Sequence, residues 1–181
     1  MALVVGISGT LHSPSKTDRV LAAILAATAE RTGRATETIA VLDHGHAIVD
    51  ALAAPAGPPL AAAYDSVLAA EALVVATPVY KGSYTGLLKA FVDPLAQDAL
   101  ADRPVLLVAV GGDDQHSLVI DHELRPLFGF FGAAVLPRGI YVRAADLADP
   151  DVLSPRLQDA IEGAVDRLAI LLGTAPGAAP S

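Results

Sequence analysis

Short, mostly apolar runs alternate along the chain with longer segments in which apolar residues recur at helical spacing. A strand that is buried on both faces of a sheet is expected to be apolar throughout, as residues 74–75 and 105–110 are. The predicted strands span residues 3–8, 36–42, 72–77, 105–110 and 133–142. The last contains Pro137 and Gly139, which interrupt strand pairing, and we therefore expect it at an edge of the sheet.

The longer segments predict helices between these strands. In the first of them, apolar residues from Val20 to Thr28 recur on one helical face. The predicted helices span residues 14–31, 60–70, 86–96, 117–131 and 154–172. Residues 53–59 are rich in proline and contain a glycine, and this composition predicts a linker.

Alternating strands and helices predict an α/β fold, in which helices cover both faces of a parallel sheet. The 181 residues suit one domain, which we assign to residues 1–173, followed by a tail at 174–181 that we expect to be disordered. Sheets of this kind bind ligands at the carboxyl ends of their strands, where the strand order reverses. The loops after the first, third and fourth strands are therefore the places to look for a site.

Composition narrows the class of protein and of partner. The chain is 53% hydrophobic and 18% charged, so we expect a homodimer or homotetramer that covers apolar surface; the alternative is an alanine content that reflects codon usage. The net charge of −8 provides no basic face, so no nucleic-acid partner is expected. The absence of cysteine excludes disulfides, thiolate catalysis and thiolate metal ligands.

Nothing in the sequence predicts export or insertion into a membrane. The first ten residues, MALVVGISGT, lack a basic segment and carry too short an apolar run for a signal peptide. No apolar run approaches the roughly 18 residues that a transmembrane helix needs. We expect a cytoplasmic protein with no membrane partner.

The loop after the first strand, SGTLHSPSKT at residues 8–17, combines hydroxyls, a glycine and two basic side chains before a helix. A helix N-terminus offers unpaired N–H groups and a partial positive charge, which favour a phosphate, and Ser15, Lys16 and Thr17 are candidate donors. The pattern is neither GxGxxG nor GxxxxGK[ST], which disfavours a dinucleotide turn or an ATPase loop. The alternative is an ordinary helix cap at Ser13 or Ser15.

The loop after the third strand, ATPVYKGSYTG at residues 76–86, contains two of the four tyrosines of the chain. Pro78 keeps the residue before it extended, and Gly82 lets the backbone turn or approach a ligand closely. Tyr80 and Tyr84 offer ring faces. A flat heteroaromatic ligand suits this segment, whereas the alternative is a helix start whose tyrosines pack on the core.

The loop after the fourth strand is GGDDQH at residues 111–116. Its two glycines allow a flat ligand to approach. The acidic pair and the histidine indicate surface solvation or a helix cap, because their spacing matches no strong metal-ligand pattern, and we expect no metal site. Together the three loops best suit FMN in a flavodoxin-like three-layer sandwich, with five parallel strands in the order 2-1-3-4-5.

The string VATPVYKGSYTGLLK at residues 75–89 resembles the flavin-ring loop of the NAD(P)H-dependent FMN reductases. The resemblance extends to the reductase components of two-component alkanesulfonate and methanesulfonate monooxygenase systems. The similarity extends from Val4 to about Leu172 and includes PSKT at 14–17 and VGG at 110–112. It implies that NADPH or NADH reduces FMN, which then passes to a separate monooxygenase that cleaves a C–S bond.

The resemblance also implies which residues bind the flavin. The phosphate would contact Thr10, His12, Ser15, Lys16 and Thr17. The ring would rest on Pro78, Val79, Tyr80, Lys81 and Ser83, with Gly111, Gly112 and Asp113 on its other side and His116 as a further candidate in the same loop. No catalytic acid or base is expected, because the hydride passes between two cofactors.

Two positions depart from the pattern of the family. His12 stands where the phosphate loop commonly has an arginine; since histidine is only partly charged near neutral pH, we expect weaker FMN binding or more dependence on Lys16. His122 stands where the alkanesulfonate reductase has an inserted tyrosine, which forms a π-helix near the flavin at a tetramer interface. A π-helix with a modulatory role for His122 and an ordinary exposed histidine are both open.

Two other functions fit the same loops. One is a related flavoenzyme that holds FMN tightly and reduces quinones, azo dyes or chromate. The other is a flavodoxin-like electron carrier without NAD(P)H turnover, which Lys81 and an aromatic content of 4% disfavour. The sequence does not separate NADPH from NADH, and Arg19, Arg103 and Arg138 are the candidates for contacting a 2′-phosphate.

Overall fold

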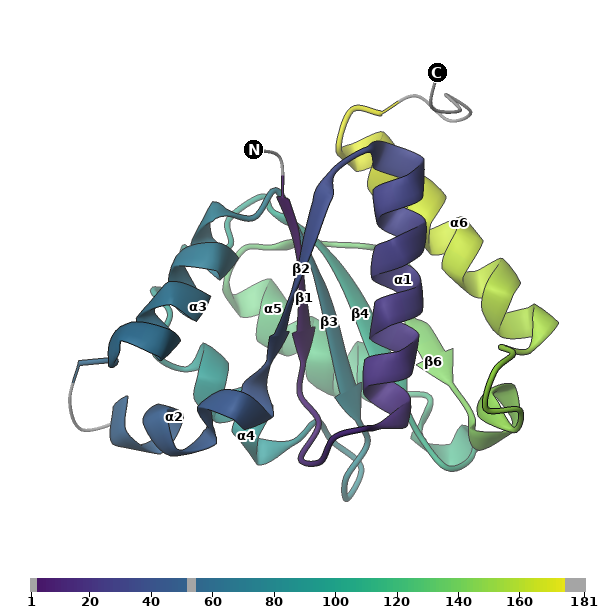
Figure 1. Ribbon diagram of the computed structural model, residues 1–181, viewed down its shortest axis with the longest axis horizontal. Coiled ribbons are helices and arrows are strands. Elements are labelled where there is room, and N and C mark those ends of the chain that lie inside the picture. Colours follow the sequence, from purple (N-terminus) through teal and green to yellow (C-terminus); the bar gives the residue numbers. More distant parts are fainter. Residues whose placement is uncertain (1–2, 52–54, 175–181) are drawn as a thin grey trace.

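A parallel sheet forms the centre of the molecule, with helices on both faces (Figure 1). The computed structural model describes residues 3–51 and 55–174. The strands are β1 (Leu3–Ser8), β2 (Ala35–Ala40), β3 (Ala72–Pro78), β4 (Pro104–Val110), β5 (Ala134–Val135) and β6 (Ile140–Val142). Their order is β2-β1-β3-β4-β5, and β6 also pairs with β4. The predicted order 2-1-3-4-5 is therefore confirmed, with two short strands at the fifth position.

The predicted strand 133–142 is thus two strands with a break between them. β5 pairs with the start of β4 at Pro104, and β6 pairs with its end at Val110. Between them Pro137 has no N–H to donate to a neighbouring strand. A Cβ at Gly139 would lie 2.7 Å from the carbonyl oxygen of Leu107, so only glycine fits so close to β4. This strand position is the edge of the sheet, as these two residue types predict.

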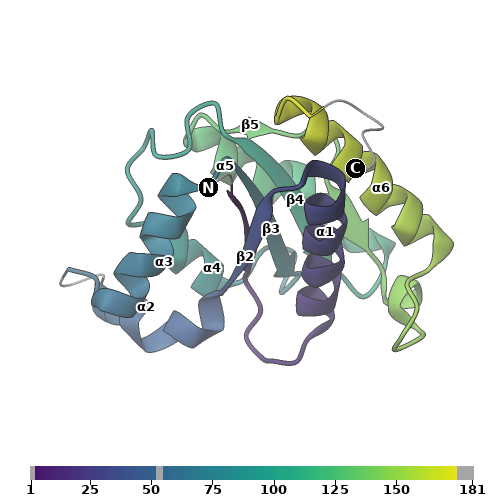
Figure 2. The same cartoon turned by 45° about the horizontal axis from the view of Figure 1, so that its top comes forward.

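Alternate residues of each strand face two separate helical layers. The helices over the sheet are α1 (Lys16–Thr32), α3 (Pro58–Ala69), α4 (Gly86–Val92), α5 (Arg125–Phe130) and α6 (Pro155–Leu171). Val4 and Val74 pack with α1 and α6, whereas Val5 and Val75 pack with α3, α4 and α5. Figure 2 shows these two layers on opposite sides of the strands. Because successive strand residues point to opposite faces, the sheet needs the continuous apolar runs that the sequence contains.

Helix boundaries differ from the prediction where a cap or a proline intervenes. α1 begins at Lys16, because Ser15 is its N-cap. α4 ends at Val92 rather than at residue 96, since Pro94 has no N–H to continue the helical hydrogen bonds. Four helical segments of the described residues were not predicted. They are α2 (Gly45–Ala51) and 3-10 turns at Val41–His44, where the second strand was expected to end, at Asp114–His116 and at Ala144–Leu147.

Two predicted irregular segments lie partly outside the described residues. Of the linker predicted at 53–59, the first two residues are not described, and Pro58 already belongs to α3. Of the tail predicted at 174–181, only Thr174 is described.

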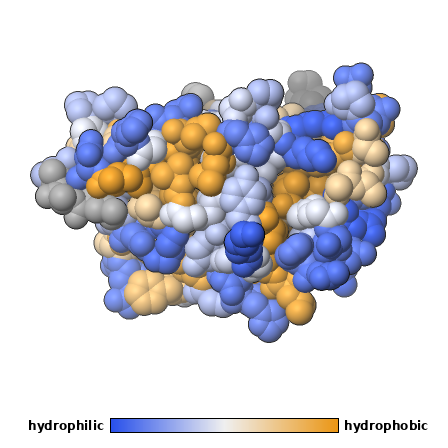
Figure 3. Space-filling view, turned by 90° about the horizontal axis from the view of Figure 1, so that it is seen from below, coloured by the Kyte–Doolittle hydropathy of each residue, from blue (hydrophilic) through white to orange (hydrophobic). Residues whose placement is uncertain are grey.

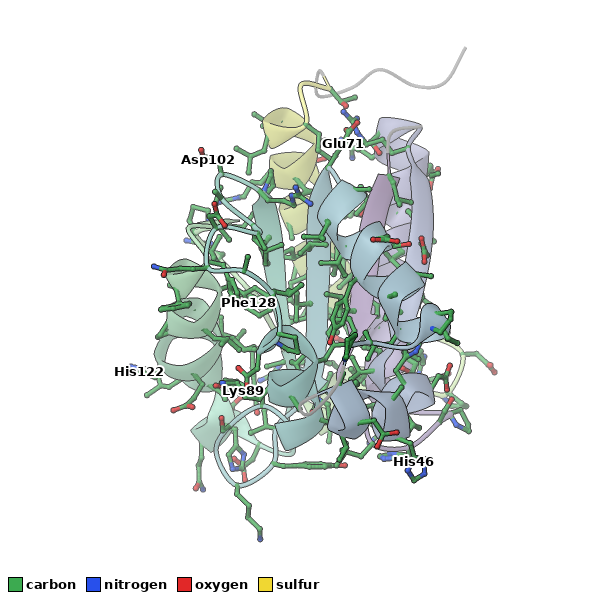
Figure 4. All side chains as sticks on the ribbon, turned by 90° about the vertical axis from the view of Figure 1, so that its left-hand side faces the viewer. His46, Glu71, Lys89, Asp102, His122 and Phe128 are labelled. Atoms are coloured by element: carbon green, nitrogen blue, oxygen red, sulfur yellow. The ribbon has the colours of Figure 1, made fainter. Side chains whose placement is uncertain are left out.

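The helix predicted at 117–131 is interrupted by a π-helix at Ile120–Leu124, which leads directly into α5. The N–H of Arg125 donates to the carbonyl of Ile120, five residues earlier, as a π-helix requires. His122 lies in the middle of this segment and is exposed, and Figure 4 shows its side chain pointing away from the body of the protein. The π-helix that the resemblance raised is therefore present.

Candidate functional site

A cavity of about 730 Å³ opens at the carboxyl ends of β1, β3 and β4, between loops that follow these strands. Figure 3 looks onto this end of the molecule, where apolar surface, in orange, lies among hydrophilic residues. The volume is in the range of small-molecule and cofactor sites. Ten of the fourteen predicted binding residues line it: Thr10, His12, Ser15, Lys16, Thr17, Pro78, Val79, Tyr80, Gly111 and Gly112.

The N-terminus of α1 forms one wall of the cavity. The hydroxyl of Thr10 donates to the carbonyl of His12 at 3.1 Å, which fixes the loop before the helix. The hydroxyl of Ser15 accepts a hydrogen bond from the N–H of Asp18 at 3.0 Å, so the helix cap that the sequence left as an alternative is present. Lys16 is exposed beside it. A helix N-terminus next to a lysine is an arrangement that favours a phosphate.

A further wall comes from the segment at residues 144–150, which the sequence analysis missed. Ala144, Leu147, Ala148 and Pro150 line the cavity together with Arg19. The guanidinium group of Arg19 donates to the carbonyl of Asp149 at 2.7 Å and so joins α1 to this segment. No motif marks these residues. Their place beside the first loop follows from the packing of α1 against α6, and no local signal could have shown it.

Asp146 holds the segment in place from beneath. Its side chain is only 3% exposed, and it accepts hydrogen bonds from the N–H of Arg143 at 2.9 Å, the hydroxyl of Ser154 at 2.8 Å and the guanidinium group of Arg156. The hydrogen bonds from Arg156 are the main cause that holds the pKa of this carboxyl well below its ordinary value, despite its burial. A buried carboxylate whose oxygens are all paired fixes the backbone between β6 and α6.

The loop after β3 ends in a tight two-residue turn. Tyr80 and Ser83 exchange two backbone hydrogen bonds, at 2.9 and 3.1 Å, and Lys81 and Gly82 between them have φ values of 53° and 79°. Left-handed backbone at both central positions is typical of a type I′ turn. Lys81 therefore lies at the tip of the turn. It does not line the cavity, whereas Pro78, Val79 and Tyr80 do.

Ser83 also lies outside the cavity, because it contacts the π-helix. Its hydroxyl donates to Oε2 of Glu123 at 2.9 Å. Burial is the main cause that raises the pKa of the neighbouring Tyr84; Lys89 lowers it and the carboxylate of Glu123 raises it further. The π-helix thus reaches the loop after β3 through Glu123, whereas His122 is turned outwards.

We expect Ser83 and Glu123 to stabilise this loop as a pair. Ser83→Ala and Glu123→Ala should each lower the free energy of unfolding by about 1 kcal/mol, because each removes the same hydrogen bond to a partly buried carboxylate. The double variant should therefore cost less than the sum of the two, with a coupling of about 0.5–1 kcal/mol. Urea unfolding of the four proteins measures this, and strictly additive losses would contradict the pairing.

The two glycines after β4 serve different purposes. A Cβ at Gly111 would overlap the side chain of Tyr141, with 2.8 Å to its ring carbon Cζ. At Gly112 no described atom lies within 4 Å of such a Cβ. Both glycines line the cavity, as predicted for a ligand-binding loop. The packing of Tyr141 also requires Gly111, whereas Gly112 is the position with free space.

Asp113 caps the turn that follows, and His116 lies in that turn. The carboxylate of Asp113 accepts from the N–H of Gln115 at 2.9 Å and lies 3.4 Å from Nδ1 of His116. Neither side chain lines the cavity. The cap that the sequence offered as an alternative is therefore present at Asp113.

The three arginines considered for a 2′-phosphate are far apart in the structure. Arg19 lines the cavity, Arg103 donates to the carbonyls of Val67 and Leu68, and Arg138 lines a separate, smaller cavity. Within residues 3–51 and 55–174, no three His, Asp or Glu side chains are grouped as a metal ion would require. The helices of this described part are all too short or too polar to cross a bilayer.

A ligand with a phosphate and a flat ring fits these walls. The N-terminus of α1 with Lys16 offers the positive end, and Pro78, Val79 and Gly112 offer an apolar and open surface at the other loops. The apolar residues of the segment at 144–150 complete the enclosure.

Comparison with known proteins relates the chain to flavin reductases. Residues 2–147 match the sequence model of a family described as NADPH-dependent FMN reductase. The NADH-dependent FMN reductase SfnF of Pseudomonas fluorescens is 41% identical over 172 residues, which cover 94% of this chain and 92% of the relative. The FMN reductase (NADPH) of Pseudomonas aeruginosa is 40% identical over 171 residues, with the same coverage of both chains.

Solved structures agree with this relationship. An NADH:FMN oxidoreductase (EMOB) in its apo form has a TM-score of 0.85 and 30% identity, and the match covers 98% of this chain and 92% of that one. An oxidoreductase from Corynebacterium diphtheriae has a TM-score of 0.85 and 34% identity, with 96% and 97% covered. An archaeal flavodoxin, with a TM-score of 0.63 and 11% identity over 94% of this chain and 99% of its own, shares the fold alone. The predicted flavodoxin-like fold is confirmed.

Proposed function

The chain belongs to the NADPH-dependent FMN reductase family, and from that premise we propose that it binds FMN in the cavity and reduces it with NADH or NADPH. One observation carries the proposal: loops after three different strands meet around a single cavity of about 730 Å³. Bound FMN supplies the hydride-accepting ring, so the protein needs no acid or base of its own. The protein binds the two cofactors, orients them and excludes water.

The ten predicted residues that line the cavity are proposed to hold FMN. Thr10, Thr17 and Lys16 with the N-terminus of α1 hold the phosphate, and Pro78 to Tyr80 hold the ring, with Gly112 leaving room beside it. Ser83 has a positioning role through Glu123. Lys81, Asp113 and His116 shape the turns on which the lining residues stand.

Reduced FMN is proposed to leave for a separate FMN-dependent monooxygenase in organosulfur metabolism. The similarity to reductases of the Sfn group supports this step. The exposed positions of His12 and Lys16 support it as well, since a phosphate held near solvent can depart without a large rearrangement. The dinucleotide remains NADH or NADPH, because relatives of almost equal similarity are named for each.

A homodimer or homotetramer in the cytoplasm completes the proposal. Leu118 and Phe130, on either side of the π-helix, are 61% and 64% exposed. Large apolar side chains at the surface favour association with another protein surface.

One experiment distinguishes the proposed reductase from the two alternatives, a reductase that holds FMN tightly and an electron carrier without NAD(P)H turnover. The purified protein should be colourless, or lose its colour on dialysis, and should oxidise NADH or NADPH only when free FMN is supplied. Protein that stays yellow and reduces menadione without added FMN would instead identify a reductase with a resident flavin. An absence of NAD(P)H oxidation with FMN present would leave the electron carrier.

Lys16→Ala should weaken FMN binding by about 1–3 kcal/mol, because the variant loses one charged hydrogen-bond donor to the phosphate. Quenching of flavin fluorescence measures the dissociation constant. Riboflavin, which lacks the phosphate, should bind the variant and the wild type equally. Lys81→Ala is the matched control: it removes the same charge at the same end of the molecule, from a side chain outside the cavity. Equal losses for FMN and riboflavin would contradict the phosphate assignment.

A further inference from the structure

A carboxylate lies directly behind the proposed phosphate position. Asp18 is in the first turn of α1 and half-buried. Its Oδ1 accepts the hydroxyl proton of Ser8 at 2.6 Å, and its Oδ2 accepts that of Ser15 at 2.8 Å. Ser8 is fully buried at the end of β1, and Ser15 lines the cavity. The carboxylate therefore connects the end of the central strand to the wall of the cavity.

These contacts use the hydroxyl proton that a phosphate would need. A serine hydroxyl has one proton to donate and two lone pairs that accept. Ser15 donates its proton to Asp18 and accepts from the N–H of Asp18 at 3.0 Å. Ser15 can therefore donate to a bound phosphate only by giving up its bond to the carboxylate.

The negative charge of Asp18 also disfavours binding of a phosphate at this position. The N-terminus of an α-helix carries roughly half a positive charge, which a carboxylate in the first turn offsets. Asp18 is the one acidic residue in the first turn of α1. A phosphate at this helix end meets an anion that is already in place, and Lys16, which is exposed, is the nearest lysine in the sequence.

We propose that Asp18 limits the affinity of the site for FMN by competing with the phosphate for the Ser15 hydroxyl and for the positive end of α1. The consequence is a flavin that is bound for reduction and then released. This inference rests on the proposed function, because it assumes that the FMN phosphate lies at α1. Asp18 would then oppose FMN binding, whereas Lys16 and the N-terminus of α1 favour it.

The test compares two ligands in four proteins. FMN and riboflavin are titrated against the wild type, Asp18→Asn, Asp18→Ala and Glu30→Gln, and the dissociation constants are read from flavin fluorescence. The helix cap is retained in both Asp18 variants because the backbone N–H of residue 18 still donates to Ser15, and thermal melts of each variant verify the fold. Glu30→Gln is the matched control, since it removes one negative charge from the exposed, far end of the same helix.

In Asp18→Asn and Asp18→Ala, FMN should bind about five- to tenfold more tightly, the scale of a unit charge near a helix terminus. Riboflavin binding should not change, and Glu30→Gln should behave as the wild type. If the wild type prefers FMN to riboflavin and both Asp18 variants leave this preference unchanged or reduce it, the role of Asp18 is overturned. The phosphate position of the proposed function then still stands. If none of the four proteins prefers FMN to riboflavin, the phosphate position in the proposed function fails and the inference fails with it.

Discussion

Asp146→Ala is expected to lower the free energy of unfolding by about 1–3 kcal/mol, the scale of losing hydrogen bonds to a charged group, because Arg156 is 44% exposed and water can reach it. The variant leaves the guanidinium group of Arg156 and the hydroxyl of Ser154 without their shared acceptor. Because the same carboxylate fixes the segment at 144–150, FMN affinity should fall as well. Urea unfolding and fluorescence titration measure the two effects. Asp151→Ala, in an exposed residue of the following loop, should change neither by more than about 0.5 kcal/mol.

The pH dependence of stability provides a second test of Asp146. The pKa of Asp146 is lower in the folded protein than its ordinary value of 3.8, so the unfolded chain takes up the proton first as the pH falls. The contribution of Asp146 to stability is therefore complete above about pH 5 and is lost progressively as the pH falls below about 4 towards the folded pKa. Asp146→Asn should flatten this acid limb. A limb of unchanged slope would contradict the assigned role.

Gly111→Ala is expected to lower the free energy of unfolding by about 1–3 kcal/mol, as overpacking usually does. The new methyl group would force the ring of Tyr141 to move, and its hydroxyl would lose the hydrogen bond that it donates to the carbonyl of Asp113. The loop after β4 would shift with it, so FMN should bind more weakly. Gly112→Ala, at the position with free space, should leave stability within about 0.5 kcal/mol of the wild type.

The Tyr141→Ala background isolates the mechanism of the Gly111 effect. Without the ring, a methyl group at residue 111 meets open space, and the cost of Gly111→Ala in stability should largely disappear. An equal cost in both backgrounds would show that the glycine is required for a reason other than Tyr141.

The fold was predictable because its signals are local. Continuous apolar runs such as 105–110 fit a sheet covered on both faces, and Pro137 with Gly139 marked the edge. Prediction failed where the local signal is too short. The segment Gly45–Ala51 has only 7 residues, too few to show a helical period, and its contact with the core is made by the buried Ile48.

The site was predictable in the parts that follow strands directly. The lining residues at 10–17 and 78–80 come immediately after β1 and at the end of β3, and position alone brings such residues to one end of the sheet. The direction in which a side chain points was not predictable in the same way. Ser83 follows Tyr80 closely in sequence, but a two-residue turn carries it to Glu123, and Asp113 is directed to a cap. These contacts are between residues far apart in the sequence or depend on φ values that no motif specifies.

The hydrogen bond from Arg19 to the carbonyl of Asp149 joins residues that a ribosome adds to the chain 130 positions apart. The loop at residues 10–17 is made well before the segment at 144–150 and before α6, which packs beside α1. A nascent chain therefore carries one wall of the cavity long before it has the other. The proposed flavin site is therefore complete only after the segment at 144–150 has been made and has packed beside α1.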